Sequence, residues 1–120
     1  MTLKEITETV PIRAAHRCEY CRMHQALQGA TLHVEHIVPK SRGGVTELTN
    51  LAFACVSCNL HKSDLIEAPD PLTETAAPLF NPRKDQWADH FSWNQFQVEG
   101  KSAIGRATVD ALHLNSERRL

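Results

Sequence analysis

Residues 18–21 read Cys-Glu-Tyr-Cys and residues 55–58 read Cys-Val-Ser-Cys, and these two short motifs decide the fold. Two residues between cysteines allow both thiolates of a motif to face one ion, and two such motifs complete a tetrahedral all-sulfur zinc shell. The alternatives are disulfides, which are rare in a reducing cytosol, and a thioredoxin-like redox pair, which needs only one motif. We therefore predict a structural Zn²⁺ ion, without catalytic chemistry, held by Cys18, Cys21, Cys55 and Cys58.

The segment between and after the cysteine motifs has the pattern of two strands and a helix. Residues 32–38 alternate in the period-two manner of a half-buried strand, and residues 51–55 are a short apolar strand. The pair Gly43 and Gly44 marks a loop between them. Residues 59–67 have helical spacing, so the expected order is strand, loop, strand, helix.

The segments outside this core are predicted from proline, serine and apolar spacing. A helix is expected over residues 11–17, where a proline suits the first turn, and another over residues 103–112 behind a serine cap. Proline and small polar residues make residues 67–78 a linker. We therefore predict a zinc-stapled core over residues 1–66 and a C-terminal extension over residues 79–120 that packs on this core.

Aromatic side chains are concentrated in the predicted extension. Five of the seven aromatic residues lie there: Phe80, Trp87, Phe91, Trp93 and Phe96. We expect them to pack on the small core, and stacking on nucleic-acid bases is the alternative.

Length, composition and charge limit the class of protein. A chain of 120 residues with 42% hydrophobic and 22% charged residues has the size and composition of one globular domain. The longest apolar run is six residues, Leu51 to Val56, against the roughly 20 that a membrane helix needs, and the N-terminus lacks a secretory core. We expect a cytoplasmic protein without a membrane partner. The net charge of −1 gives no basic field that would indicate DNA.

A specific constellation accompanies the cysteines. The chain reads E-H-I-V-P-K-S-R-G-G at residues 35–44, N-L at residues 50–51 and C-V-S-C-N-L-H-K at residues 55–62. Over roughly residues 11–66 this resembles the HNH endonuclease family, in the subgroup whose ββα-metal motif is stapled by a four-cysteine zinc. The resemblance implies an α+β fold with a small treble-clef-like ββα-metal core, a structural zinc and a helical, aromatic C-terminal extension. The tail pieces L-F-N-P-R, W-x2-H-F-x-W and I-G-R-A-T-V resemble an extension of some bacterial members and imply no chemistry.

The resemblance also implies metal-dependent hydrolysis of DNA phosphodiester bonds. His36 would be the general base, since an imidazole with an ordinary pKa near 6.5 accepts a proton at neutral pH. Glu35 and Asn59 would hold a catalytic Mg²⁺ or Mn²⁺ through hard oxygen ligands, and Asn50 would position the loop. Adjacent strand residues point to opposite faces, so bringing Glu35 and His36 to one site requires a bend. The candidate phosphate contacts are Lys40, Arg42, His61 and Lys62.

The alternative function is a four-cysteine zinc module that binds nucleic acid or protein without cutting. Such a module needs the cysteines but has no use for His36 or Asn59, which favours the enzyme. The near-neutral charge favours the module, because phosphate neutralisation provides most nonspecific affinity for DNA. For an enzyme acting on DNA, the local cluster of Lys40, Arg42 and Lys62 or a partner domain would supply the grip, and a double-strand cut by one small active site would indicate a homodimer.

Overall fold

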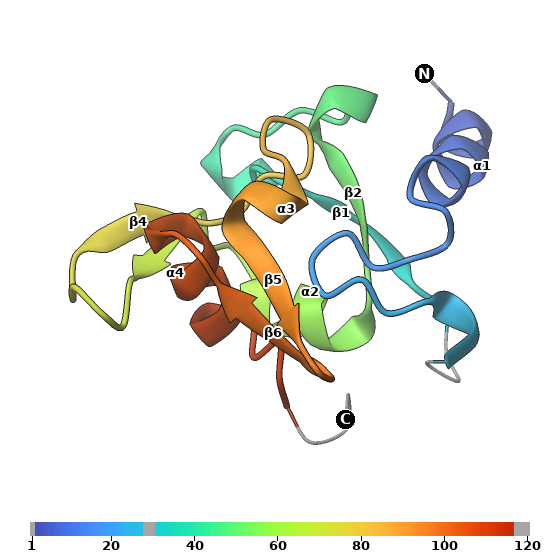
Figure 1. The fold of residues 1–120 in the computed structure, drawn as a ribbon. Coiled ribbons are helices and arrows are strands. Elements are labelled where there is room, and N and C mark those ends of the chain that lie inside the picture. Colours follow the sequence, from blue (N-terminus) through green and yellow to red (C-terminus); the bar gives the residue numbers. More distant parts are fainter. Residues whose placement is uncertain (1, 28–30, 117–120) are drawn as a thin grey trace.

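The computed structural model describes residues 2–27 and 31–116, and it places a β-hairpin and a helix between two outer segments (Figure 1). The elements of the first half are α1 (Leu3–Arg13), β1 (His33–His36), β2 (Leu51–Ala54) and α2 (Val56–Lys62), with single 3-10 turns at Gln25–Leu27, Lys40–Arg42 and Leu48–Asn50. Those of the second half are β3 (Glu67–Pro69), β4 (Ala76–Pro78), α3 (Trp87–His90), β5 (Phe91–Asn94), β6 (Gln97–Gly100) and α4 (Ala103–Ala111). In Figure 1, α1 lies on one side of the central hairpin, and α4 with the β3–β4 hairpin lies on the other.

The central hairpin confirms the predicted order of strand, loop, strand and helix. β1 and β2 pair antiparallel, with His36 opposite Leu51, and every residue of β2 is buried. α2 begins at Val56, earlier than the predicted residue 59, because the cysteine motif forms its first turn. The Sγ atom of Cys55 caps the helix by accepting a hydrogen bond from the Cys58 backbone N–H at 3.4 Å.

The N-terminal helix differs from its prediction. The sequence predicted residues 11–17, whereas α1 begins at Leu3, where the Thr2 hydroxyl accepts a hydrogen bond from the Glu5 N–H at 3.1 Å. The proline lies in the last turn, and the chain leaves the helix through Ala15 and His16, which have left-handed φ values of 54° and 58°. These two residues turn the chain toward the first cysteine motif.

Residues 67–78, expected to be a linker, form the antiparallel β3–β4 hairpin, which packs against α4. Its turn holds the buried Asp70, whose carboxylate accepts hydrogen bonds from Arg106 at 2.9 and 2.8 Å. The predicted C-terminal helix is confirmed as α4, with the Ser102 hydroxyl accepting from the Gly105 N–H at 3.0 Å. The predicted linker is therefore an ordered part of the extension.

The aromatic residues of the extension divide into two groups. Phe80 and Phe91 are buried and Trp87 is partly buried against them, as expected. The expectation is wrong for Trp93 and Phe96, which are 53% and 80% exposed.

Two polar contacts tie the extension to the first cysteine motif. The Trp87 indole N–H donates to the Tyr20 carbonyl at 2.9 Å, and Arg83 pairs with Glu19. None of the helices in the described part of the chain is long and apolar enough to cross a membrane.

Candidate metal centre and active site

The four cysteines converge on one point, as their spacing predicted. Their Sγ atoms all lie within 4.8 Å of one another, and those of Cys21 and Cys55 are 3.8 Å apart. A zinc tetrahedron with bonds of about 2.3 Å places its sulfurs about 3.8 Å apart, so the donor set fits the ion. All four cysteines are buried and none is in a disulfide, and no other cluster of three or more His, Cys, Asp or Glu ligands occurs within residues 2–27 and 31–116.

The backbone of each motif supports its sulfurs. The N–H of Cys21 donates to Cys18 Sγ at 3.5 Å, matching the Cys58 to Cys55 contact that caps α2. Burial raises the pKa of the Cys18 thiol well above its ordinary value, whereas hydrogen bonds with Cys18 lower the pKa values of Cys21 and Cys55. A divalent cation would hold all four cysteines as thiolates. The site is therefore suited to a structural metal.

The two residues between the first pair of cysteines lock this motif to the hairpin. Two hydrogen bonds join Glu19 to Phe53 in β2. The Glu19 N–H donates to the Phe53 carbonyl at 2.9 Å, and the Glu19 carboxylate accepts from the Phe53 N–H at 2.8 Å. The fully buried Tyr20 donates its hydroxyl to Glu35 Oε1, and burial, followed by the charge of Glu35, raises the pKa of Tyr20. The motif thus reaches from the cysteines to β1 and β2.

His36 closes β1 and presents its imidazole at a partly exposed position. Its Nε2 lies 2.8 Å from the Thr46 hydroxyl, which belongs to the loop between β1 and β2. Burial lowers the pKa of His36 below its ordinary 6.5, and the nearby Lys40 and Lys62 lower it further. The imidazole is therefore neutral at neutral pH, which is the form that accepts a proton.

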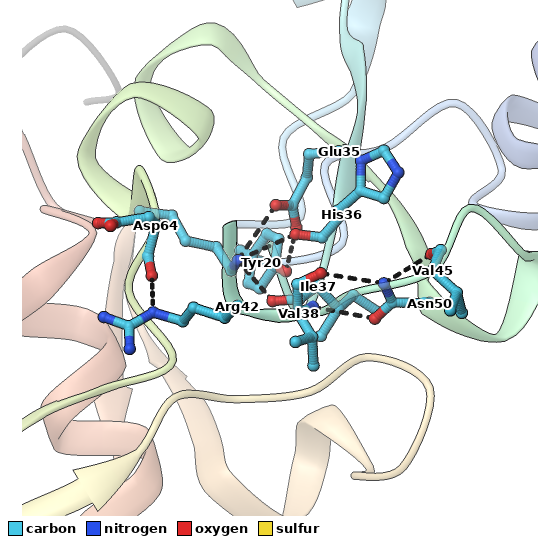
Figure 2. A network of polar contacts seen from close by, with 10 residues as sticks. Tyr20, Glu35, His36, Ile37, Val38, Arg42, Val45, Asn50 and Asp64 are labelled. Carbon is cyan, nitrogen blue, oxygen red and sulfur yellow. Dashed lines mark hydrogen bonds and ion pairs between the residues drawn. The ribbon is translucent and has the colours of Figure 1, made fainter. Parts of the chain in front are cut away.

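Asn50 fastens the loop that carries Thr46 (Figure 2). Its Oδ1 accepts from the Val38 N–H at 2.9 Å, while its Nδ2 donates to the carbonyls of Val38 at 3.0 Å and Val45 at 2.9 Å. Gly44 permits this closure, because a Cβ atom there would overlap the Val38 carbonyl oxygen. Asn50 thus fixes both ends of the loop without contacting the imidazole directly.

Glu35 turns away from His36 and into the protein (Figure 2). Its Oε2 lies 3.2 Å from Lys62 Nζ, and its Oε1 accepts the Tyr20 hydroxyl, so both carboxylate oxygens have internal partners. The same ammonium donates to the carbonyls of Ile37 at 2.8 Å and His36 at 3.3 Å. Burial raises the pKa of Glu35, and Lys62 opposes this rise. Lys62 is thus an internal cation between α2 and the end of β1.

The structure brings some of the predicted catalytic residues together and keeps others apart. Glu35, His36 and Asn50 all lie near the end of β1, but their side chains do not contact one another. Asn50 binds the backbone of Val38, and Glu35 reaches the backbone of residues 36 and 37 only through Lys62. Asn59 lies on α2, partly exposed, and the contacts of the described residues include none between its side chain and Glu35.

The predicted phosphate contacts also divide. Lys40 and Arg42 are exposed, and Arg42 donates its Nε to the Asp64 carbonyl at 2.6 Å. The partly exposed His61 bonds the Ser57 carbonyl at 2.8 Å, and its ring lies 4.2 Å from that of His113. Lys62 is buried with its ammonium on internal oxygens, so it does not present a charge to a phosphate.

Sequence reasoning missed Tyr20, Thr46 and the internal role of Lys62. A lysine on a short helix is ordinarily exposed, and nothing in its neighbours along the chain signals a buried partner. Tyr20 carried a usable signal, since a tyrosine between two metal-binding cysteines is held close to the core. Thr46 had none, because its role depends on the closure of the loop.

A β-hairpin followed by a helix, with four cysteines meeting behind them, defines the ββα-metal class of fold. Residues 18–65 match the family described as HNH endonuclease, and this segment belongs to that family. Among curated proteins, the chain is similar to the Septu protein PtuB of Bacillus thuringiensis, with 32% identity over 107 residues that cover 88% of this chain. The chain spans 39% of the length of that relative. No solved structure matches the chain.

Proposed function

We propose that this chain is an endonuclease that hydrolyses DNA phosphodiester bonds with His36 as its general base. Family membership supports a nuclease-type function in general. The observation that carries the proposal is the setting of His36, a partly exposed imidazole of lowered pKa held by Thr46 on a loop that Asn50 fastens. A rigidly placed neutral imidazole is suited to taking a proton from the attacking water.

Exposed and partly exposed basic side chains supply the charge that a phosphate requires. Lys40 and Arg42 are exposed on the turn that follows β1, and His61 is partly exposed on α2. Arg42 is anchored to the Asp64 carbonyl through its Nε atom, and Figure 2 shows its terminal nitrogens pointing away from that carbonyl. We propose these three side chains as the phosphate contacts.

A catalytic Mg²⁺ or Mn²⁺ on Glu35 and Asn59 stays a prediction from the family resemblance. Such an ion would supply charge neutralisation at the scissile phosphate when bound. In the structure, Lys62 occupies the cation position beside Glu35, so the present arrangement of Glu35 does not fit a divalent ion.

The alternative is a zinc module that binds without cutting, and one observation favours it. Both oxygens of Glu35 are engaged by Tyr20 and Lys62, as expected of a carboxylate with a structural role. The cysteine cluster is compatible with either function. The two proposals differ in the consequence of losing His36, which only the enzyme needs.

The test is nicking of supercoiled plasmid by zinc-loaded protein with Mg²⁺, with Mn²⁺ or with no added ion. His36→Ala should lower the cleavage rate by about 100-fold or more, the usual effect of deleting a general base. His33→Ala is the matched control, because His33 is an exposed histidine on the same strand. The wild-type rate should fall as the pH drops through the lowered pKa of His36, since protonation removes the base.

Undiminished nicking by His36→Ala would show that the base is wrongly assigned. Retardation of plasmid by a folded wild-type protein that does not cut with any ion would favour the binding module.

A further inference from the structure

A groove of about 330 Å³ lies between the first cysteine motif and the tip of the β5–β6 hairpin. We call it the aromatic groove. It is separate from the proposed active site, because its lining includes neither His36 nor the loop that Asn50 fastens. The lining side chains that carry the argument are aromatic, aliphatic or basic: Arg17, Arg22, His24, Leu27, Trp93 and Phe96.

A stack of planar groups extends into the aromatic groove. The Arg22 guanidinium lies 5.3 Å from the centre of the Trp87 ring, and the Trp87 ring lies 5.6 Å from that of Trp93 at an angle of 36°. Trp93 is the outermost ring and half exposed, and Phe96 at the hairpin tip is more exposed still. Two large aromatic rings facing water beside a groove are typical of a binding surface.

The charge of the aromatic groove determines which partner fits. Arg17, Arg22 and His24 contribute basic groups, and no Asp or Glu occurs among the described residues that line it. Arg17 donates to the Arg22 carbonyl at 3.0 Å, which holds the two arginines on one turn. This basic character is local, since the whole chain has a net charge of −1. The ligand should therefore be anionic and carry flat apolar surfaces.

We propose that the aromatic groove binds unpaired nucleotides of a DNA strand. The bases stack on Trp93 and Phe96, and the phosphates face Arg17 and Arg22, the combination by which proteins hold single strands without reading their sequence. A duplex hides its base faces in the stack and cannot use the rings. The inference rests on the proposed function and narrows its substrate to DNA with a single-stranded stretch.

The test is fluorescence anisotropy with a labelled oligothymidylate and with a blunt duplex of similar length, using zinc-loaded protein in the His36→Ala background to prevent cutting. Trp93→Ala and Phe96→Ala should each weaken oligothymidylate binding about fivefold or more, the usual cost of losing a stacked base. Duplex affinity should not change. Leu72→Ala is the control, because Leu72 is an exposed apolar residue in the β3–β4 turn that does not line the aromatic groove.

Oligothymidylate affinity that is unchanged in both aromatic variants would overturn the inference and assign the aromatic groove to an acidic protein partner instead. Wild-type protein that binds duplex as tightly as single strand would overturn it as well. Plasmid nicking, measured separately with His36 intact, distinguishes the two proposals. If the protein nicks plasmid but Trp93→Ala does not change its affinity for single-stranded DNA, only the proposal for the aromatic groove is refuted. If Trp93→Ala weakens single-strand binding but the protein with His36 intact does not cut, only the proposed nuclease function is refuted.

Discussion

Glu35 in the HNH segment and Asp70 in the extension are both buried carboxylates with a basic partner, yet their pKa values shift in opposite directions. Burial raises the pKa of Glu35 despite Lys62, whereas hydrogen bonds from Arg106 lower the pKa of Asp70 from 3.8 to about 2. The exposed side-chain fractions are 6% for Glu35 and 0% for Asp70. Desolvation by burial is the largest influence on the pKa of Glu35, whereas at Asp70 the hydrogen bonds from Arg106 outweigh it.

The two carboxylates also differ in the number of hydrogen-bond donors that oppose this desolvation. Asp70 accepts two hydrogen bonds from Arg106, one from the Leu72 N–H and one from the Thr73 hydroxyl. Glu35 accepts one from Tyr20 and shares the Lys62 ammonium with two carbonyls. The donors around Asp70 therefore outweigh the cost of burying its charge, whereas the donors around Glu35 do not.

The largest expected effect comes from breaking the cysteine cluster of the HNH segment, residues 18–65. Cys58→Ser removes one sulfur ligand, and structural zinc contributes about 10–16 kcal/mol of apparent binding energy, comparable with the whole stability of a domain. We expect loss of bound zinc and loss of the native far-ultraviolet circular dichroism. Because Tyr20 and Trp87 join the two regions, tryptophan fluorescence should change in the same transition.

Val56→Ser is the control for this experiment, since Val56 is an exposed residue of the same motif that contributes no ligand. A native dichroism spectrum in metal-free protein would contradict the structural role of the cluster.

The second-largest effect is expected from removing the basic partner of Glu35. Lys62→Met removes the internal ammonium and leaves a buried carboxylate with Tyr20 alone, which should cost about 3–5 kcal/mol of unfolding free energy near neutral pH. Because burial raises the pKa of Glu35 above 4.5, this variant should be most stable where Glu35 is protonated and should lose stability as the pH rises through the raised pKa. Urea denaturation at acidic and at neutral pH measures the loss of unfolding free energy and its dependence on pH.

Two further variants isolate the charge in this pair. Glu35→Gln combined with Lys62→Met should recover much of the lost stability, because no unpaired charge stays buried. Lys40→Met, at an exposed position, should change little. If Lys62→Met and Lys40→Met unfold at the same urea concentration, the internal cation has no structural role.

The sequence predicted most of the HNH segment because metal chemistry restricts residue types at fixed spacing. The Cys-x2-Cys motifs predicted one cluster, and the structure brings the four cysteine sulfurs together. The strands on either side of the glycine pair followed from alternation and loop residues, and both are found as β1 and β2. The catalytic set around His36 is a prediction that the proposed mutations test.

The rest depended on contacts between residues distant in the chain. Residues 67–78 have the composition of a linker, but the buried pair of Asp70 and Arg106 joins positions 36 residues apart and orders the hairpin. The inward direction of Lys62 depends in the same way on Glu35 across the HNH segment. The aromatic cluster predicted a core, and only the fold separates buried Phe91 from exposed Phe96.

The smallest of the three effects is expected from breaking the ion pair of Asp70 and Arg106 in the extension. Arg106→Met should lower the melting temperature less than Lys62→Met, because Arg106 is 28% exposed and Asp70 keeps its contacts with Leu72 and Thr73. A lowered pKa in the folded state contributes stability above pH 3.8 that disappears as the pH falls toward about 2. The difference in melting temperature between wild type and Arg106→Met should therefore be largest above pH 3.8 and shrink in acid.

Lys84→Met, which changes an exposed residue of the same extension, should show no such trend. A difference that stays constant across this pH range would mean that Arg106 acts through packing alone, and the contrast with Glu35 would then rest on burial after all.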